Sequence, residues 1–254
     1  MPELSLNDWL AYGTLAGLFL IFIISYFIAR AKAAQNKASA KENTRLDAIL
    51  HRSSERGEGV LVGTSEGAGA QVGSLAGLAG LQTQAHVFRH SLHSDLPPKT
   101  VAGDGNLVAL SQQLNASIYH SADMPELYKL DSSGLAGIGS YAYLAGLIPE
   151  LSRPNLSSLL MQGELSPELI LALDVAKRHD LDAIMASSSL SGQAAAHFID
   201  PQSALGEETF MSQSTRPREK AGLKATLICL KIARGLIIAG LLVAILLQLL
   251  GVLP

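Results

Sequence analysis

Hydrophobic and polar residues divide this chain into three parts, with an uncharged apolar run near each end and a mixed segment between them. The first run covers residues 9–29 and the second covers residues 235–254. Each run is about 20 residues long, which is the length that a helix needs to cross the hydrocarbon core of a bilayer. The pattern therefore predicts two transmembrane helices, one within residues 1–30 and the other at residues 235–254.

The segment between the runs alternates short apolar stretches with stretches of helical period. We expect strands at residues 60–62, 100–102, 127–130, 157–161, 182–186 and 197–199. Between and around them we expect helices at residues 45–56, 74–89, 106–114, 135–151, 166–179 and 202–213. This alternation predicts a Rossmann-like α/β domain with a mainly parallel sheet over residues 44–214. A polar helical stalk (31–43) and a basic juxtamembrane segment (215–234) would join it to the spans.

Basic residues follow the first apolar run and precede the second, including Arg30, Lys32, Lys231 and Arg234. Positive charge beside a span stays on the cytoplasmic side and favours contact with anionic lipid. We therefore expect a cell-membrane (inner-membrane) protein with both termini outside and the central domain in the cytoplasm. A cleaved signal peptide is disfavoured, because the residues before the first run are acidic and the run is too long.

Small residues at four-residue spacing occur in both apolar runs. Gly13 and Gly17 form one such pair, and Gly240 and Ala244 form the other. This spacing lets membrane helices pack closely, so the two spans are candidates for packing against each other or against other membrane proteins. The alternative is that glycine and alanine are simply common in membrane helices.

The charge balance and the cysteine content exclude several classes of function. A net charge of −3 gives no electrostatic case for nucleic-acid binding, and one cysteine excludes a disulfide framework or a Cys-based metal site. His86 and His90 have the i, i+4 spacing of zinc ligands, with His93 one turn further on. No glutamate follows His86 as in a zincin, and a solvated histidine-rich helix end is the alternative, so no metal site is predicted.

A glycine-rich segment between the first strand and the second helix is the clearest candidate for ligand binding. Gly67, Gly69 and Gly73 follow a strand and open a helix, where backbone N–H groups can approach a pyrophosphate. The spacing GxGxxxG is a variant of the dinucleotide-binding pattern. A bound nucleotide is therefore one hypothesis, and no other cofactor is indicated. The alternative is a tight turn that brings the helix close to the sheet.

Polar residues at the predicted strand ends supply further candidates, namely Asp104, Asn106, Ser187, Ser188 and Ser189. Ligands of open α/β sheets bind at the carboxyl ends of the strands. The same residue types also cap helices, which is the alternative role. The sequence holds no nucleophile motif such as G-x-S-x-G and no other set of catalytic residues, so an enzymatic function is disfavoured.

Several short motifs follow one another in a characteristic order: residues 45–49 before 59–62, then 74–78, 133–145 and 205–211 before the basic segment. This order resembles a known family of two-span prokaryotic membrane proteins, the domain of unknown function family 6754. The resemblance implies a cytoplasmic α/β domain between two spans. It implies no reaction, so no catalytic residue is carried over.

Two loops depart from the family pattern. A Pro-Gly turn of the family is replaced by residues 63–67, and an Asn-Arg-Asp-Pro stretch is replaced by residues 103–106. A ligand bound at these loops would therefore differ in this chain. The leading hypothesis is a membrane-anchored, non-enzymatic scaffold that self-associates as a homo-oligomer through its α/β domain. The alternative is a regulatory module that binds a nucleotide or another small ligand at the membrane surface.

Overall fold

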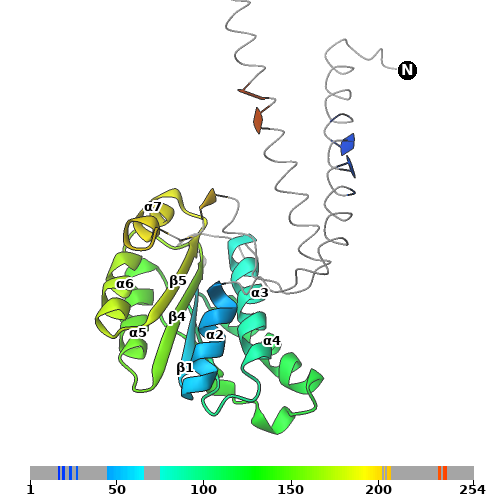
Figure 1. Cartoon of the computed structure of the whole chain (residues 1–254), viewed down its shortest axis with the longest axis vertical. Coiled ribbons are helices and arrows are strands. Elements are labelled where there is room, and N and C mark those ends of the chain that lie inside the picture. Colours follow the sequence, from blue (N-terminus) through cyan, green and yellow to red (C-terminus); the bar gives the residue numbers. More distant parts are fainter. Residues whose placement is uncertain are drawn as a thin grey trace, which may run out of the picture. The chain divides into compact units, whose positions relative to one another are not determined.

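The computed structural model describes residues 45–65, 75–201, 203, 205 and 206, together with single positions at 17, 19, 20, 23, 24, 27, 234, 235, 237 and 238. The chain divides into two compact units, one of Met1–Glu42 with Thr215–Pro254 and the other of Asn43–Ser214. The fold described below belongs to the second unit (Figure 1). Its elements are α2 (Arg45–Arg56), β1 (Gly59–Ser65), α3 (Leu75–His90), β2 (Lys99–Ala102), α4 (Gly105–Ser121), η2 (Pro125–Leu127), η3 (Leu130–Ser132), β3 (Ser133–Leu135), α5 (Ser140–Leu151), β4 (Leu156–Gly163), α6 (Leu169–Arg178), β5 (Asp182–Ser187) and α7 (Leu190–Ile199).

Five parallel strands form one sheet in the order β3-β2-β1-β4-β5. Val62 of β1 aligns with Thr100 of β2 on one side and with Leu160 of β4 on the other. The chain starts in the middle of the sheet, builds out to the β3 edge, and then returns to add β4 and β5. This is the order of a doubly wound sheet without a sixth strand. The predicted α/β class and parallel sheet are confirmed, and the order is consistent with a Rossmann-like domain.

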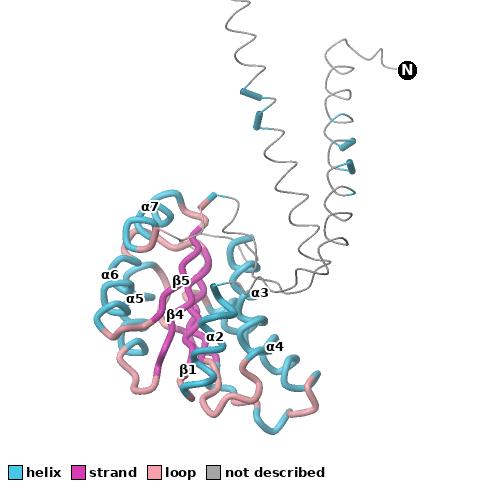
Figure 2. The backbone as a smooth tube through the Cα atoms, in the orientation of Figure 1, coloured by secondary structure: helices cyan, strands magenta, loops and turns pink. Residues whose placement is uncertain are grey.

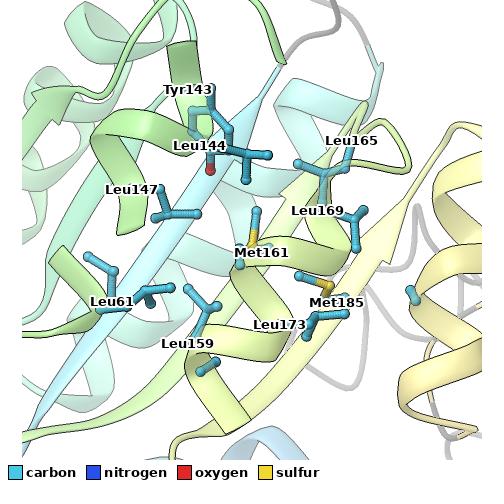
Figure 3. Close-up of a cluster of buried hydrophobic side chains, with 14 of the residues drawn as sticks. Leu61, Tyr143, Leu144, Leu147, Leu159, Met161, Leu165, Leu169, Leu173 and Met185 are labelled. Atoms are coloured by element: carbon cyan, nitrogen blue, oxygen red, sulfur yellow. The ribbon is translucent and has the colours of Figure 1, made fainter. Parts of the chain in front are cut away.

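Helices cover both faces of the sheet, with α2, α3 and α4 on one side and α5, α6 and α7 on the other (Figures 1 and 2). Successive side chains of a strand point to opposite faces, so β1 contributes to two cores. Leu61 packs in the larger cluster with Leu147 of α5 and Leu173 of α6 (Figure 3). Val60 and Val62 pack on the other face, in the cluster with Leu46 and Leu50 of α2 and Val87 of α3.

Close approach of α3 to the sheet depends on Gly80. A Cβ atom at this position would lie 2.9 Å from the carbonyl oxygen of Gln162 on β4. Three residues further along α3, the buried hydroxyl of Thr83 donates a hydrogen bond to Oε1 of Gln162. The close packing of this helix on the sheet, which was the alternative to nucleotide binding for the glycine-rich segment, is therefore present at Gly80.

Two predicted strands are wrong. Residues 127–130 fall in and between the short 3-10 helices η2 and η3, where Pro125 occupies the first turn, and the edge strand is β3. Residues 197–199 form the last turn of α7, because Ala195, Ala196 and Ile199 follow a helical spacing that packs them on the larger core. The remaining strands and the helices that fall within the described residues are at or close to the predicted positions.

Among the residues that the structure describes, no helix combines the length and the apolar character that a membrane crossing needs. Most of both predicted spans lies outside these residues, as do the stalk and most of the helix predicted at 202–213. Of the residues expected to pack in the spans or contact lipid, Gly17 and Arg234 are helical and exposed. The others lie outside the described residues: Gly13, Gly240, Ala244, Arg30, Lys32 and Lys231.

Candidate functional site

The carboxyl edge of the sheet has its switch point between β1 and β4. The helices α3 and α4, which follow β1 and β2, cover one face, whereas α6, which follows β4, packs on the other. Connections that leave two neighbouring strands in opposite directions open a crevice beyond the strand ends, and ligands of doubly wound folds bind there. This edge is therefore the candidate ligand site.

The glycine-rich segment predicted to bind a nucleotide belongs to this edge by sequence. Gly67, Gly69 and Gly73 lie outside the described residues. The structure places the elements on both sides of the segment, since β1 ends at Ser65 and α3 begins at Leu75. A strand followed directly by a helix is the context that a dinucleotide-binding turn requires. Nucleotide binding by this segment stays a prediction.

Asp104 and Asn106 lie at the carboxyl end of β2, where Asp104 caps α4. The Oδ1 atom of Asp104 accepts hydrogen bonds from the backbone N–H of Asn106 at 2.7 Å and of Leu107 at 3.3 Å. These bonds satisfy two N–H groups that have no partner within the helix. The capping role that was the alternative for Asp104 is therefore present, and it occupies one carboxylate oxygen.

The serines after β5 form hydrogen bonds with neighbouring segments of the same chain. The buried Ser187 hydroxyl donates to the carbonyl oxygen of Leu165 at 2.8 Å and accepts from the Ser189 N–H at 3.1 Å. Ser189 is the N-cap of α7, with its hydroxyl accepting from the Gly192 N–H at 3.4 Å. The Ser188 N–H donates to the carbonyl oxygen of Gly163 at 3.0 Å. These contacts join the ends of β4 and β5 and start α7.

A small pocket opens at the switch point, on the side covered by α5 and α6. Its polar lining residues come from the end of β1, the segment after β4 and the first turns of the two helices. Neither α5 nor α6 has a side-chain hydrogen bond at its N-cap, in contrast to α4 and α7. At α6 the first N–H groups are satisfied by the backbone instead, since Leu169, Ile170 and Leu171 donate to the carbonyl oxygens of Ser166, Pro167 and Glu168. The polar lining residues are Ser65, Ser140, Tyr143, Glu164, Ser166 and Glu168.

Tyr143 is the most buried polar residue of this pocket. It is 3% exposed, and its hydroxyl has no hydrogen-bond partner. Burial raises the pKa of the Tyr143 hydroxyl above its ordinary value, so the group stays protonated and able to donate at neutral pH. One carboxylate oxygen of Glu168, Oε2, is also buried without a partner. The pocket thus offers a hydroxyl donor and a carboxylate acceptor, and none of its described lining residues is basic.

Two surfaces of exposed apolar side chains lie at opposite edges of the sheet. One is on and beside the edge strand β3; we call it the β3-edge surface, and it consists of Leu127, Leu130, Leu135, Ile138 and Tyr141. The other is on α6 and α7, the two helices that pack against β5; we call it the α7-edge surface, and it consists of Ile170, Leu171, Leu190 and Phe198. Ile138 is 73% exposed, and Phe198 is 85% exposed. Exposed apolar side chains that form a contiguous patch mark contact sites, so these two sets are the candidate contact surfaces of the domain.

The three histidines considered as zinc ligands do not share one helix in the structure. His86 and His90 lie on α3, where Nε2 of His86 is 2.9 Å from Oδ1 of Asp47 on α2. His93 is exposed in the turn after α3. Within the described ranges, no group of three or more histidine, cysteine or acidic side chains has an arrangement that could hold a metal ion.

Comparisons with known proteins add no assignment, because no family model, curated protein or solved structure matches this chain. The resemblance to the domain of unknown function family 6754 therefore stays a prediction.

Sequence reasoning missed the pocket around Tyr143 and both apolar surfaces. The apolar residues at 127–130 are visible in the sequence, where they predict a strand. Their exposure depends on the tertiary fold.

Proposed function

We propose that this chain is a membrane-anchored scaffold whose α/β domain self-associates edge to edge. The observation that carries the proposal is the presence of two different apolar surfaces at opposite edges of one sheet. The β3-edge surface adjoins the edge strand β3, and the α7-edge surface lies on the helices that pack against the other edge strand, β5. Membrane anchoring is proposed from the apolar runs at residues 9–29 and 235–254 and from the basic residues beside them.

Hydrophobic burial supplies the driving force for such an assembly. Ile138, Tyr141, Leu190 and Phe198 are each more than two-thirds exposed. Covering a Leu, Ile or Phe side chain contributes about 1.5–3 kcal/mol, and several together can offset part of the entropy lost on association. The strand β3 pairs with β2 on one side. Its other side is an edge of the sheet, where backbone groups can pair with another chain.

A second copy of this chain is the favoured partner, because the two surfaces differ in position and composition. A contact between different surfaces of identical chains is heterologous, and it repeats until the assembly closes into a ring or continues as a filament. Anchoring each chain in a bilayer restricts such an assembly to neighbours side by side. We therefore propose a ring or a linear array in the membrane.

The test uses the full chain in lipid nanodiscs or detergent, with mass photometry as the readout. We expect the wild type to form species larger than one chain, and Ile138→Asp and Phe198→Asp to reduce these species strongly. Mixing the two variants should restore pairs, because each retains the surface that the other lacks. His120→Asp, at an exposed position of α4 that belongs to neither surface, serves as the control. A wild type that is monomeric at micromolar concentration would overturn the proposal.

A second candidate function is the binding of a small ligand at the carboxyl edge of the sheet. It is supported by the Tyr143 hydroxyl, which has no hydrogen-bond partner and belongs to a residue that lines a pocket beside the first turns of α5 and α6. Calorimetry of the full chain with adenosine and with ATP tests it, using Tyr143→Phe as the variant. Since Glu164 and Glu168 line the pocket, we expect adenosine to bind better than ATP there. Absence of heat with both probes would exclude nucleotide binding. An affinity for adenosine that is unchanged in Tyr143→Phe would show that the ligand binds outside the pocket.

A further inference from the structure

Four titratable side chains meet where α2 packs beside α3. Each helix contributes a pair at i, i+4 spacing, which places both members on one helix face. The pair on α2 is Asp47 and His51, and the pair on α3 is His86 and His90. The rings of His51 and His90 meet edge to face with centroids 4.6 Å apart, and the rings of His86 and His90 are 6.4 Å apart. The Oδ1 atom of Asp47 lies at hydrogen-bond distance, 2.9 Å, from Nε2 of His86.

The cluster has too little negative charge to balance three protonated imidazole rings. It contains three imidazole rings and one carboxylate, so full protonation would leave an excess of two positive charges between the helices. The Nδ1 atom of His90 is buried and has no hydrogen-bond partner. Burial lowers the pKa of His90, the neighbouring His51 and His86 lower it further, and Asp47 acts in the opposite direction. A proton added to His90 would therefore enter a site without a partner for it and beside two other imidazoles.

Among the residues that the structure describes, only three side chains act on His90 electrostatically. The groups that act on it electrostatically are Asp47 and His51 from α2 and His86 from its own helix. His93 and Asp95 lie in the turn after α3 and are exposed, with Asp95 beside Gly57 at the end of α2. Asp47 can compensate for one protonated imidazole, and it already lies against His86.

The helix α2 covers one of the two hydrophobic cores. Leu46 and Leu50 pack on Val60 and Leu160 of the sheet, next to Val87 of α3. On its other side, α2 is held to the β5 region by ion pairs of Arg45 with Asp200 at 2.5 Å and of Arg52 with Asp182 at 3.2 Å. Repulsion at the α3 side therefore acts on a helix whose opposite side keeps its own contacts.

We propose that the Asp47–His51–His86–His90 cluster is a proton-responsive contact that holds α2 on α3 at neutral pH and loosens α2 in mild acid. The contact is complete while His90 is neutral. It weakens when His90 takes up a proton, because the positive charge is then partly buried beside two other imidazole rings and without a hydrogen-bond partner at Nδ1. The device is independent of the proposed self-association and regulates access to the core that α2 covers.

The pH range follows from the direction of the shift. A histidine whose folded-state pKa is lowered is protonated more readily in the loosened or unfolded state. The contribution of the contact is therefore full above the ordinary histidine pKa of about 6.5, and it is lost progressively as the pH falls below that value.

Hydrogen exchange measured by mass spectrometry on the full chain in nanodiscs tests this inference. Protection factors, corrected for the intrinsic rate at each pH, are compared at pH 7.5 and pH 5.5 for a peptide covering α2 and one covering β4. We expect protection of α2 to fall about tenfold in the wild type at pH 5.5, while β4 stays protected. The double variant His51→Gln with His90→Gln should keep the same α2 protection at both values. His93→Gln, which changes a histidine outside the cluster, should behave as the wild type.

Two results would overturn the inference. One is a wild type whose α2 protection is the same at both pH values. The other is a loss of α2 protection in the double variant as large as that in the wild type. Protection of β4 at pH 7.5 shows whether the double variant is folded. If it is not, the single variant His51→Gln, at an exposed position, must show a smaller acid effect than the wild type.

Discussion

The hydroxyl of Tyr143 on α5 lies directly over Gly63 in the centre of the sheet. A Cβ atom added to Gly63 would come within 2.5 Å of this oxygen and within 3.2 Å of Cγ of Met161. The ring of Tyr143 also lies against Gly103, where an added Cβ would be 3.2 Å from Cδ2. The two glycines therefore create the space that a buried tyrosine fills beside the switch point.

This relationship predicts that Gly63→Ala destabilises the domain. The new methyl group overpacks a site that has no room for it, at a cost of roughly 1–3 kcal/mol. Tyr143→Phe removes the hydroxyl oxygen that lies over Gly63. The double variant Gly63→Ala with Tyr143→Phe should therefore recover part of the stability that Gly63→Ala loses. The free energy of unfolding from urea titrations, followed by far-UV circular dichroism, measures both effects.

Gly134→Ala is the matched control for Gly63→Ala. Gly134 lies in a strand of the same sheet, but a Cβ there would meet no atom within 4 Å. We expect this control to change the stability by much less than Gly63→Ala. Equal effects of the two substitutions, or no recovery with Tyr143→Phe, would contradict the described packing.

Burial of Tyr143 also predicts a specific sensitivity to alkaline pH. Its pKa is raised in the folded state, so the unfolded chain loses this proton first, at a pH near 10. The corresponding stability is present below that pH and is lost as the pH rises toward the folded-state value. Tyr143→Phe should therefore lose less stability than the wild type between pH 8 and pH 10.5 in urea titrations.

Tyr141→Phe is the control for the alkaline effect, since Tyr141 is 71% exposed and lies on the same helix. It should lose as much stability as the wild type over this range. If Tyr143→Phe also matches the wild type, the hydroxyl of Tyr143 is not buried as described.

A buried polar network joins α3, α4 and β3, with Asn115 at its centre. The side chain of Asn115 accepts from Nε2 of Gln84 at 2.8 Å and donates to the Ser133 hydroxyl at 2.9 Å. Asn115→Ala removes both bonds and leaves buried partners with fewer contacts, so we expect a loss of about 2–4 kcal/mol in the free energy of unfolding. Gln113→Ala, at an exposed position of the same helix, should cost under about 1 kcal/mol. Similar losses for the two variants would show that the network is not buried in solution.

Local sequence patterns predicted most of the α/β domain, because its central strands are continuous apolar runs between amphipathic helices. The helix at residues 45–56 and the strand at 182–186 illustrate this, since apolar residues with clear periodicity determine both. The edge strand β3 could not be predicted in this way. Its sequence Ser133-Gly134-Leu135 has no apolar run, and it pairs because β2 offers a free edge. The exposed Leu127 and Leu130 resemble a buried strand in sequence, and only the fold shows that they face solvent.

The candidate sites depended still more on tertiary structure. Capping by Asp104 and Ser189 was foreseeable, because these residue types precede helices. The pocket beside Tyr143 was not, because it combines residues from β1, β4, α5 and α6. The histidine cluster was half visible, since the i, i+4 spacing identified His86 and His90, whereas Asp47 and His51 come from another helix.

Cross-linking between the two apolar surfaces tests the central claim most directly. Cys229 is the only cysteine, so a Cys229→Ser background allows single cysteines to be placed at Ile138 in one population and at Phe198 in another. The two populations carry different affinity tags and are reconstituted together in liposomes. Edge-to-edge assembly predicts efficient disulfide cross-links between Ile138→Cys and Phe198→Cys chains, and few within either population alone. Cross-links mainly between identical positions, or none above the level of a cysteine placed at His120, would contradict the account.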